Sequence, residues 1–379
     1  MTQQAYDVAI AGLGAMGSAA ACHLGLNGAR VIGFDRFHPP HDLGSSHGES
    51  RIIRQAYIED PRYVPMVQRA YELWADLEDR VGARLLQRTG GVMIGEAGSD
   101  VVQGARASAE QHGLEHEVLD AEEIRRRFPA LSPADEMCGV YEPAPGVLFP
   151  EECVASHLRV AADQGADLRF EEEVTGWVRD GSGVKVITPS GAYRAGMLLI
   201  AAGAWLPYLA PGLDLPLTVE RQVMFWFRPS GNPAYFLPGA CPVSVWEYDS
   251  GKRVYALPDM GTGFKAARHH DGERTDAHSI DRTTRQEDEE TVKDMLRRYI
   301  PGGNGPVLRS SVCMYTDTPD FHFLVDYHPD HSNVLIASPC SGHGFKFASM
   351  IGEMLSEMLL KGQSRFDLGL FSMSRLMDR

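Results

Sequence analysis

Three glycines near the N-terminus, Gly12, Gly14 and Gly17 in the segment GLGAMG, have a spacing that could do chemistry. A GxGxxG turn between a strand and a helix lets backbone N–H groups approach a pyrophosphate at the helix N-terminus. Asp35 lies 18 residues after Gly17, at the end of the next apolar run, where its carboxylate can accept ribose hydroxyls. The pattern predicts a dinucleotide site and leaves NAD and FAD open, the alternative being a glycine-rich turn in an ordinary α/β domain.

A second segment favours FAD. Residues 197–205, MLLIAAGAW, form an apolar run that ends in small residues, including Ala202 and Gly203. This run resembles the second, Ala-Gly-containing strand of FAD enzymes of the glutathione-reductase-like superfamily. A buried strand with a small-residue turn is the simpler reading of the segment on its own.

Four separated segments together resemble the monomeric sarcosine oxidase and N-methyltryptophan oxidase family. They are the N-terminal unit, GSSHGESRIIRQAY at 44–57, GTGFKAARHHDG at 261–272, and residues 313–347, which run from CMYTDTPDF to SGHGFKF. The resemblance covers essentially the whole chain. It implies an α/β fold with a Rossmann-type, glutathione-reductase-like FAD domain and a substrate domain with a mainly antiparallel sheet.

Within this resemblance Cys313 takes the position of a cysteine joined through sulfur to the flavin 8α carbon. A thiolate is a strong nucleophile, so the chemistry is reasonable. An isolated cysteine would otherwise be read as a small buried hydrophobe. The family commonly has a Gly-aromatic pair before its Ser-Gly-His-Gly turn, whereas this chain has Pro339 and Cys340. That departure leaves the pocket shape open and makes Cys340 a rival attachment site.

The resemblance also implies roles for residues around the substrate. Arg54 and Lys346 match a pair that binds the substrate carboxylate, by a bidentate fork and a point charge. Lys265 matches a lysine over the flavin that assists O2 reduction, and His269 a histidine that orients the substrate, with adjacent His270 as its competitor. Tyr255 and Tyr315 match aromatic residues of the same pocket. Without the resemblance, the cations would be read as surface ion pairs and the rings as core residues.

Arg51 is expected near the flavin ring, where a cation would stabilise the reduced cofactor. No carboxylate is expected to act as a general base. The full set of expected cofactor-binding residues is Gly12, Gly14, Gly17, Asp35, Arg36, Ser45, His47, Arg51, Val174, Ala202, Gly203, Cys313, Gly342, His343, Gly344 and Lys346.

The expected activity is FAD-dependent oxidation of a secondary or N-methylated amino acid to an imine, which water hydrolyses, while O2 becomes H2O2. A cyclic imino acid such as pipecolate or proline, or a larger N-substituted amino acid, is an alternative substrate. An NAD-dependent dehydrogenase and a non-catalytic FAD-binding subunit are alternatives of other kinds. The intact Lys265 and the pair Arg54 and Lys346 favour an oxidase.

Composition narrows the class of protein. The 379 residues are 44% hydrophobic and 23% charged, with a net charge of -15, which disfavours nucleic acid as a partner. The six cysteines show no CxxC spacing, so we expect no metal site, no disulfide scaffold and a reducing compartment. The N-terminal apolar run breaks at glycines and lacks a basic lead, so no signal peptide or membrane span is expected. We expect a cytoplasmic monomer.

The elements that must position these residues follow from patterns of apolar residues. Strands are expected at 6–10, 30–35, 168–205, 216–258 and 333–337, and helices at 18–26, 63–80, 153–164, 288–299 and within 344–361. The charged stretch 271–291 is expected to be a solvated loop, as a connection or a lid. Length predicts two lobes. We assign 1–85, 150–215 and 305–379 to an FAD domain, and 86–149 and 216–304 to a substrate domain.

Overall fold

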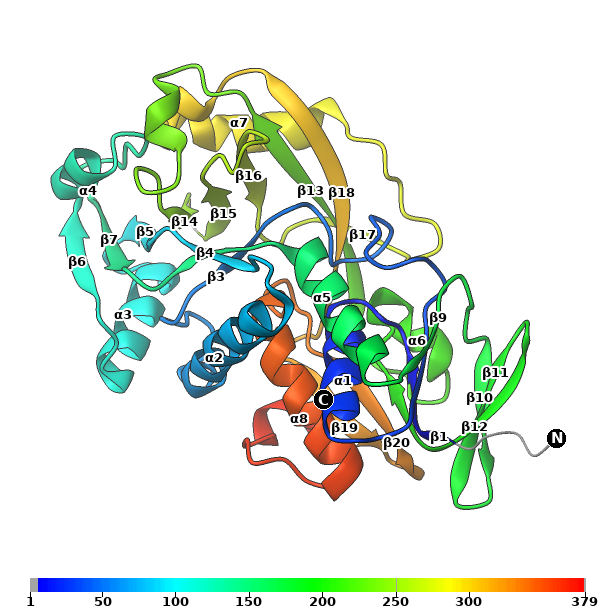
Figure 1. Ribbon diagram of the computed structural model, residues 1–379. Coiled ribbons are helices and arrows are strands. Elements are labelled where there is room, and N and C mark those ends of the chain that lie inside the picture. Colours follow the sequence, from blue (N-terminus) through cyan, green and yellow to red (C-terminus); the bar gives the residue numbers. More distant parts are fainter. Residues whose placement is uncertain (1–5, 250, 378–379) are drawn as a thin grey trace.

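The computed structural model describes residues 6–249 and 251–377 and places two large sheets side by side, with helices covering the first (Figure 1). The first sheet has eight strands and the second has nine, and a third sheet has three. The fold is therefore a mixed α/β architecture, and the predicted fold class is confirmed.

The first sheet builds the dinucleotide end. Its main path runs β10-β11-β12-β1-β2-β9, and β20 joins it through β12 and pairs with β19. Its strands are β1 (Tyr6–Ala11), β2 (Val31–Phe34), β9 (Asp167–Arg169), β10 (Gly176–Asp180), β11 (Gly183–Thr188), β12 (Gly191–Ile200), β19 (Leu324–His328) and β20 (His331–Ser338). The central strands β1, β2, β12 and β20 pair in parallel, as expected for strands joined by crossovers.

Helices cover one face of this sheet. Helix α1 (Ala15–Leu26) packs between α5 (Pro150–Asp163) and α8 (Ala348–Lys361), and α2 (Tyr63–Val81) packs on α8 (Figure 1). Small residues make this close packing possible, because a Cβ on Gly352 of α8 would lie 2.5 Å from the Ala19 carbonyl carbon of α1. The N-terminus of α1 is thereby held against the end of β1.

The second sheet is largely antiparallel. Its main path runs β17-β13-β16-β15-β14-β5-β7-β6, with β18 paired to β13, and only the β14–β5 pair is parallel. Its strands are β5 (Gly91–Glu96), β6 (Glu117–Asp120), β7 (Met137–Glu142), β13 (Thr218–Phe227), β14 (Val243–Tyr248), β15 (Lys252–Leu257), β16 (Phe264–Arg268), β17 (Glu273–Thr275) and β18 (Val307–Asp317). Because β13 and β18 pair along almost their whole length, Cys313 lies opposite Gln222 and Tyr315 lies opposite Glu220.

The remaining elements are a small sheet and the helices outside the first layer. The small sheet joins β3 (Arg51–Ile53), β8 (Gly146–Leu148) and β4 (Leu86–Arg88). The other helices are α3 (Asp100–His112), α4 (Ala121–Arg127), α6 (Leu206–Leu209), α7 (Gln286–Tyr299) and α9 (Ser374–Met377). Of these, α3, α4 and α7 pack on the second sheet. Within the described residues, no helix is long and apolar enough to cross a membrane.

The predicted strands and helices form, with four corrections. Within the predicted range 216–258, residues 228–242 lie outside the strands and contain a short 3-10 helix, Pro233–Phe236. Within the predicted range 168–205, residues 170–175 are not part of a strand, and residues 191–200 form one continuous strand, β12. The stretch 271–291 is not simply a solvated loop, because it contains β17 and is anchored by buried Arg221. The Arg221 guanidinium donates to the Asp281 carbonyl at 2.7 Å and pairs with Asp288 at 2.9 Å. The division into two domains stays a prediction, and β18, although within 305–379, belongs to the second sheet.

Candidate active site

A cavity of about 460 Å³ lies between the two large sheets. Its walls come from the β1–α1 turn, the segment 39–59, the facing strands β13 and β18, and the turn that leads into α8. Gly12 and Asp35 line it together with Arg54 and Lys346, so it reaches from the predicted dinucleotide turn to the predicted carboxylate-binding pair. Segments from both ends of the sequence therefore share one pocket.

The dinucleotide end has a backbone that only glycine fits. Gly12 has φ +96°, and a Cβ on Gly17 would lie 1.8 Å from the Gly12 carbonyl oxygen. The Asp35 carboxylate accepts the Leu13 N–H at 2.8 Å and the Phe37 N–H at 2.9 Å. Asp35 thus fixes the glycine turn, in addition to lining the cavity. These residues fit a pyrophosphate-containing cofactor.

Cys313 lies on β18 beside the Arg51 guanidinium. The Arg51 Nη2 atom is 3.8 Å from the Cys313 sulfur and donates to the Ser45 carbonyl at 2.9 Å, while Nη1 donates to the Ser50 carbonyl at 2.9 Å. These bonds hold the cation at the sulfur. Cys340 also lines the cavity. Burial, together with nearby Asp317, raises the pKa of the Cys340 thiol to about 11, so that thiol stays protonated.

Arg54 and Lys346 converge at the other end. The Arg54 guanidinium pairs with Glu59 at 3.0 Å and lies 4.5 Å from the centre of the Tyr57 ring. The Lys346 ammonium donates to the His343 carbonyl at 2.6 Å and to the Tyr57 hydroxyl at 3.4 Å. Both cations are almost completely buried, so an anion that reaches them meets little competition from water.

The charges of this end are strongly coupled. Burial, reinforced by the Arg54 cation, lowers the pKa of Lys346 to about 7. Burial alone would raise the pKa of Glu59, but the adjacent cations, first of all Arg54, outweigh burial and hold it well below its usual range. Burial also lowers the pKa of His343 to about 3, so its imidazole stays neutral. This end of the cavity therefore contains two basic side chains, Arg54 and Lys346, and the carboxylate of Glu59.

His269, Tyr255 and Tyr315 lie between these ends and line the cavity. The His269 Nδ1 atom is 3.2 Å from the Tyr315 hydroxyl, and the centre of the His269 ring is 4.2 Å from that of His270, with the two rings tilted. Burial, followed by the His270 charge, lowers the pKa of His269 well below its usual value. A neutral imidazole can hydrogen-bond a substrate without repelling a cationic amine.

Lys265 is buried but does not line the cavity. Its ammonium donates to the Gly48 carbonyl at 2.7 Å, the Ser50 carbonyl at 3.0 Å and the Ser50 hydroxyl at 3.2 Å. Burial, reinforced by Arg51, lowers its pKa well below the usual lysine value. Lys265 therefore contacts residues 48–50, directly before Arg51, from outside the cavity. His47 also lies outside the cavity, and burial lowers its pKa to about 3.

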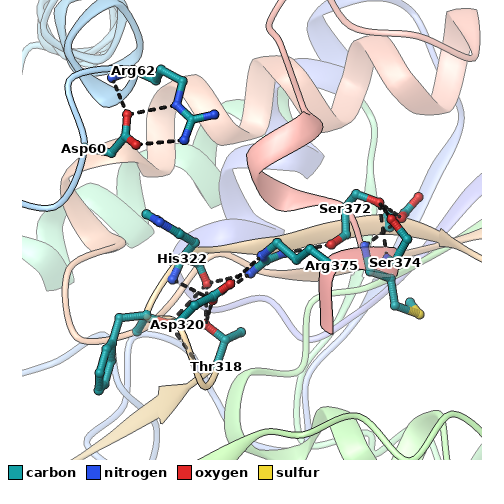
Figure 2. Close-up of polar contacts among 12 residues, drawn as sticks. Asp60, Arg62, Thr318, Asp320, His322, Ser372, Ser374 and Arg375 are labelled. Atoms are coloured by element: carbon teal, nitrogen blue, oxygen red, sulfur yellow. Dashed lines mark hydrogen bonds and ion pairs between the residues drawn. The ribbon is translucent and has the colours of Figure 1, made fainter. Parts of the chain in front are cut away.

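A polar network from the C-terminal segment supports this end. Figure 2 shows Asp320 between Arg375, Thr318 and His322, and the Arg375 Nε atom pairs with Asp320 at 3.0 Å. The neighbouring Phe321 carbonyl lies 2.9 Å from His343 Nε2, and His343 Nδ1 lies 2.6 Å from the Tyr57 hydroxyl. The turn 318–322 thus positions His343 and, through it, Tyr57 between the two cations.

The structure brings together every predicted site residue except three, since Gly17, His47 and Lys265 lie outside the cavity wall. Gly17 instead packs on the glycine turn.

Sequence reasoning missed Glu59, Tyr57 and Glu142. The Glu142 carboxylate accepts the Ala56 N–H at 2.9 Å, and burial raises its pKa to about 7. Glu59 follows Arg54 by five residues, but an acid at that spacing in a loop is no distinctive signal.

The fold and cavity define a nucleotide-dependent enzyme whose pocket can hold an organic anion. The chain belongs to the FAD dependent oxidoreductase family, which matches residues 7–358. It is 44% identical to monomeric sarcosine oxidase of Streptomyces avermitilis, over 98% of both chains. It is 33% identical to N-methyl-L-tryptophan oxidase of Yersinia pestis, over 98% of this chain and 99% of the relative. The predicted family is confirmed, and NAD is disfavoured.

Solved structures support the fold. L-proline dehydrogenase from P. horikoshii has a TM-score of 0.86 at 21% identity and covers 99% of both chains. Glycine oxidase from Geobacillus kaustophilus has a TM-score of 0.82 at 20% identity, also over 99% of both chains. At these identities the likeness establishes a shared architecture only.

Proposed function

We propose that this protein is a FAD-dependent oxidase of a secondary or N-methylated amino acid. The observation that carries the proposal is the pair of buried cations Arg54 and Lys346 in the same cavity as the glycine turn. An amino acid bound through its carboxylate there would have its amine among His269, Tyr255 and Tyr315. The names of the relatives support this substrate class.

In the proposed reaction the substrate C–N bond loses two electrons and two protons and becomes an imine. Bound FAD would supply the acceptor for the two electrons, and O2 would finally receive the two electrons and the two protons as H2O2. Water then converts the imine to an aldehyde and an amine. The chain's residues bind the carboxylate, orient the amine and exclude water, and Lys265 supplies a buried charge behind Arg51 for the O2 step.

We propose further that Cys313 holds the flavin covalently. The Arg51 guanidinium at 3.8 Å can stabilise negative charge on this sulfur. Cys340 is the weaker candidate, because the pKa of its thiol is raised to about 11. Acid precipitation tests the claim: yellow colour should stay in the pellet of the wild type and of Cys340→Ala, and should enter the supernatant for Cys313→Ala. Release from the wild type would refute the covalent bond and leave FAD dependence intact.

Anaerobic bleaching of the flavin tests the reaction class. Sarcosine and other N-methyl amino acids should bleach it, and air should restore the colour with release of H2O2. Proline and pipecolate in the same panel test the cyclic imino acids. Reduction by primary amines alone would refute the proposal, and flavin that no amine reduces would favour a non-catalytic FAD-binding subunit.

A further inference from the structure

A second cluster of polar side chains lies next to Tyr315, and the proposed reaction does not use these side chains. Glu220 on β13, Asp317 on β18 and His270 after β16 each offer one atom, and these three atoms lie within 4.8 Å of one another. The strand register explains the two carboxylates, since Glu220 lies opposite Tyr315 and Asp317 is two residues beyond it on the same face. His270 has φ +64°, which brings its ring back towards β18.

Two of the three side chains, Asp317 and His270, have buried polar atoms without hydrogen-bond partners among the described residues. Asp317 is only 4% exposed, yet among the described residues neither of its carboxylate oxygens has a hydrogen-bond partner, and neither does His270 Nδ1. Nδ1 and Asp317 Oδ2 are 3.8 Å apart, too far for a charge-assisted hydrogen bond of about 2.7–2.9 Å. A buried carboxylate without a partner is costly, so the cluster needs something more than these side chains.

The charge of the cluster is also uncompensated. Glu220 accepts the Gln222 side-chain amide at 3.0 Å and the Gly272 N–H at 3.3 Å, both neutral donors. Within residues 6–249 and 251–377, no lysine or arginine forms an ion pair with Glu220 or Asp317. Two carboxylates and an imidazole are ligands that one divalent cation can bind, and the cation would supply the positive charge that no lysine or arginine supplies here.

We propose that Glu220, His270 and Asp317 bind a divalent transition-metal ion, with zinc as the probe. An imidazole with two carboxylates suits such an ion better than Mg²⁺ or Ca²⁺, which prefer oxygen ligands alone. Zinc holds nitrogen and oxygen ligands at about 2.0–2.2 Å, so the three atoms must close in, and the half-buried Glu220 and His270 can do so. The expectation of no metal site considered only the cysteine spacing.

The ion would have a structural role. The centre of the His270 ring lies 4.2 Å from that of His269 and 5.4 Å from that of Tyr315, so fixing His270 restricts two residues of the cavity. A Cβ on Gly342 would lie 2.9 Å from the His270 ring, which shows how tightly the ring meets the turn before α8. The bound ion would therefore couple the second sheet to the turn that contains His343.

The test is equilibrium dialysis of the intact holoenzyme against micromolar ZnCl2 after EDTA treatment, with zinc per chain measured by mass spectrometry. We expect the wild type to bind one more zinc per chain than Asp317→Asn, and Glu220→Gln to weaken binding at least tenfold. Cys340→Ser controls for zinc binding by the cavity thiol. His328→Gln controls for zinc binding by His328 and His331, whose rings are 4.7 Å apart. Both variants should bind as much zinc as the wild type does.

Equal zinc in the wild type and in Asp317→Asn would mean an adventitious ion only and would overturn the proposal, as would no zinc in the wild type. If Asp317→Asn does not fold, anomalous diffraction at the zinc edge from wild-type crystals decides. A peak among the three side chains supports the site, and a peak elsewhere or none overturns it. No turnover is measured, so the outcome is independent of the proposed activity.

Discussion

The lowered pKa of Lys346 gives a sharp prediction for anion binding. At a pKa of about 7, Lys346 is charged below neutral pH and neutral above it. A carboxylate ligand favours the ammonium, so binding above pH 7 must be accompanied by proton uptake. One pKa unit corresponds to about 1.36 kcal/mol, so at pH 9 the loss is about 2.7 kcal/mol, or about 100-fold in Kd.

Methoxyacetate is a suitable ligand because it has the shape of sarcosine, has no titrating amine and cannot lose a hydride from a C–N bond. Its Kd, read from the flavin spectrum, should be constant below pH 7 and rise about tenfold per pH unit above it. Lys346→Met should bind about 10- to 150-fold more weakly at pH 6, for the loss of a charge-assisted contact worth about 1.5–3 kcal/mol. Its Kd should not change with pH, so the two Kd values meet at about pH 8 for a 10-fold loss and at about pH 9 for a loss of about 100-fold.

Other groups around Lys346 do not titrate in this range, since the pKa values of Glu59 and His343 are lowered and that of Tyr57 is raised. Glu142, whose pKa is also about 7, is the exception. Glu142→Gln should therefore keep the slope, and exposed Lys361→Met should behave as wild type. A wild-type Kd that does not change with pH, or a slope that persists in Lys346→Met, would refute the assignment.

Three further predictions test other parts of the site. Lys265→Met should slow reoxidation by O2 by about 10²–10³-fold, the usual effect of removing one electrostatic donor, and should slow flavin reduction far less. The control variant Lys252→Met, at an exposed lysine, should change neither rate. Equal slowing of both steps by Lys265→Met would contradict the role of Lys265. Gly17→Ala should lose flavin, because the new Cβ would lie 1.8 Å from the Gly12 carbonyl oxygen. The control variant Gly98→Ala, which has open space around its Cβ, should keep its flavin. Full flavin content in Gly17→Ala would contradict the prediction and show that the turn adapts. Arg375→Gln breaks the ion pair with Asp320 and should raise KM more than it lowers kcat, with partial recovery in Arg375→Lys; an unchanged KM would remove Arg375 from the positioning network.

Part of this site could be predicted from sequence because its signals are local. The turn of Gly12 and Gly17 and the carboxylate of Asp35 lie within one strand–helix–strand unit. Cys313, Arg54 and Lys346 have no such local signature and were found through the family resemblance. The pairing of Arg54 with Glu59, the bond from Glu142 to Ala56 and the cluster of Glu220, His270 and Asp317 could not be predicted, because they depend on strand register and on how loops return to the sheet.

The location of Cys313 has a consequence for how the cofactor would be held. The glycine turn belongs to the first sheet, whereas Cys313 lies on β18 of the second sheet. A thioether at Cys313 would therefore attach the flavin to the opposite wall from its pyrophosphate. Cys340 follows β20 of the first sheet, so a bond there would leave the second wall without a covalent contact. Attachment at Cys313 would tie the two sheets together through the cofactor, which gives this cysteine a role in positioning the flavin as well as in retaining it.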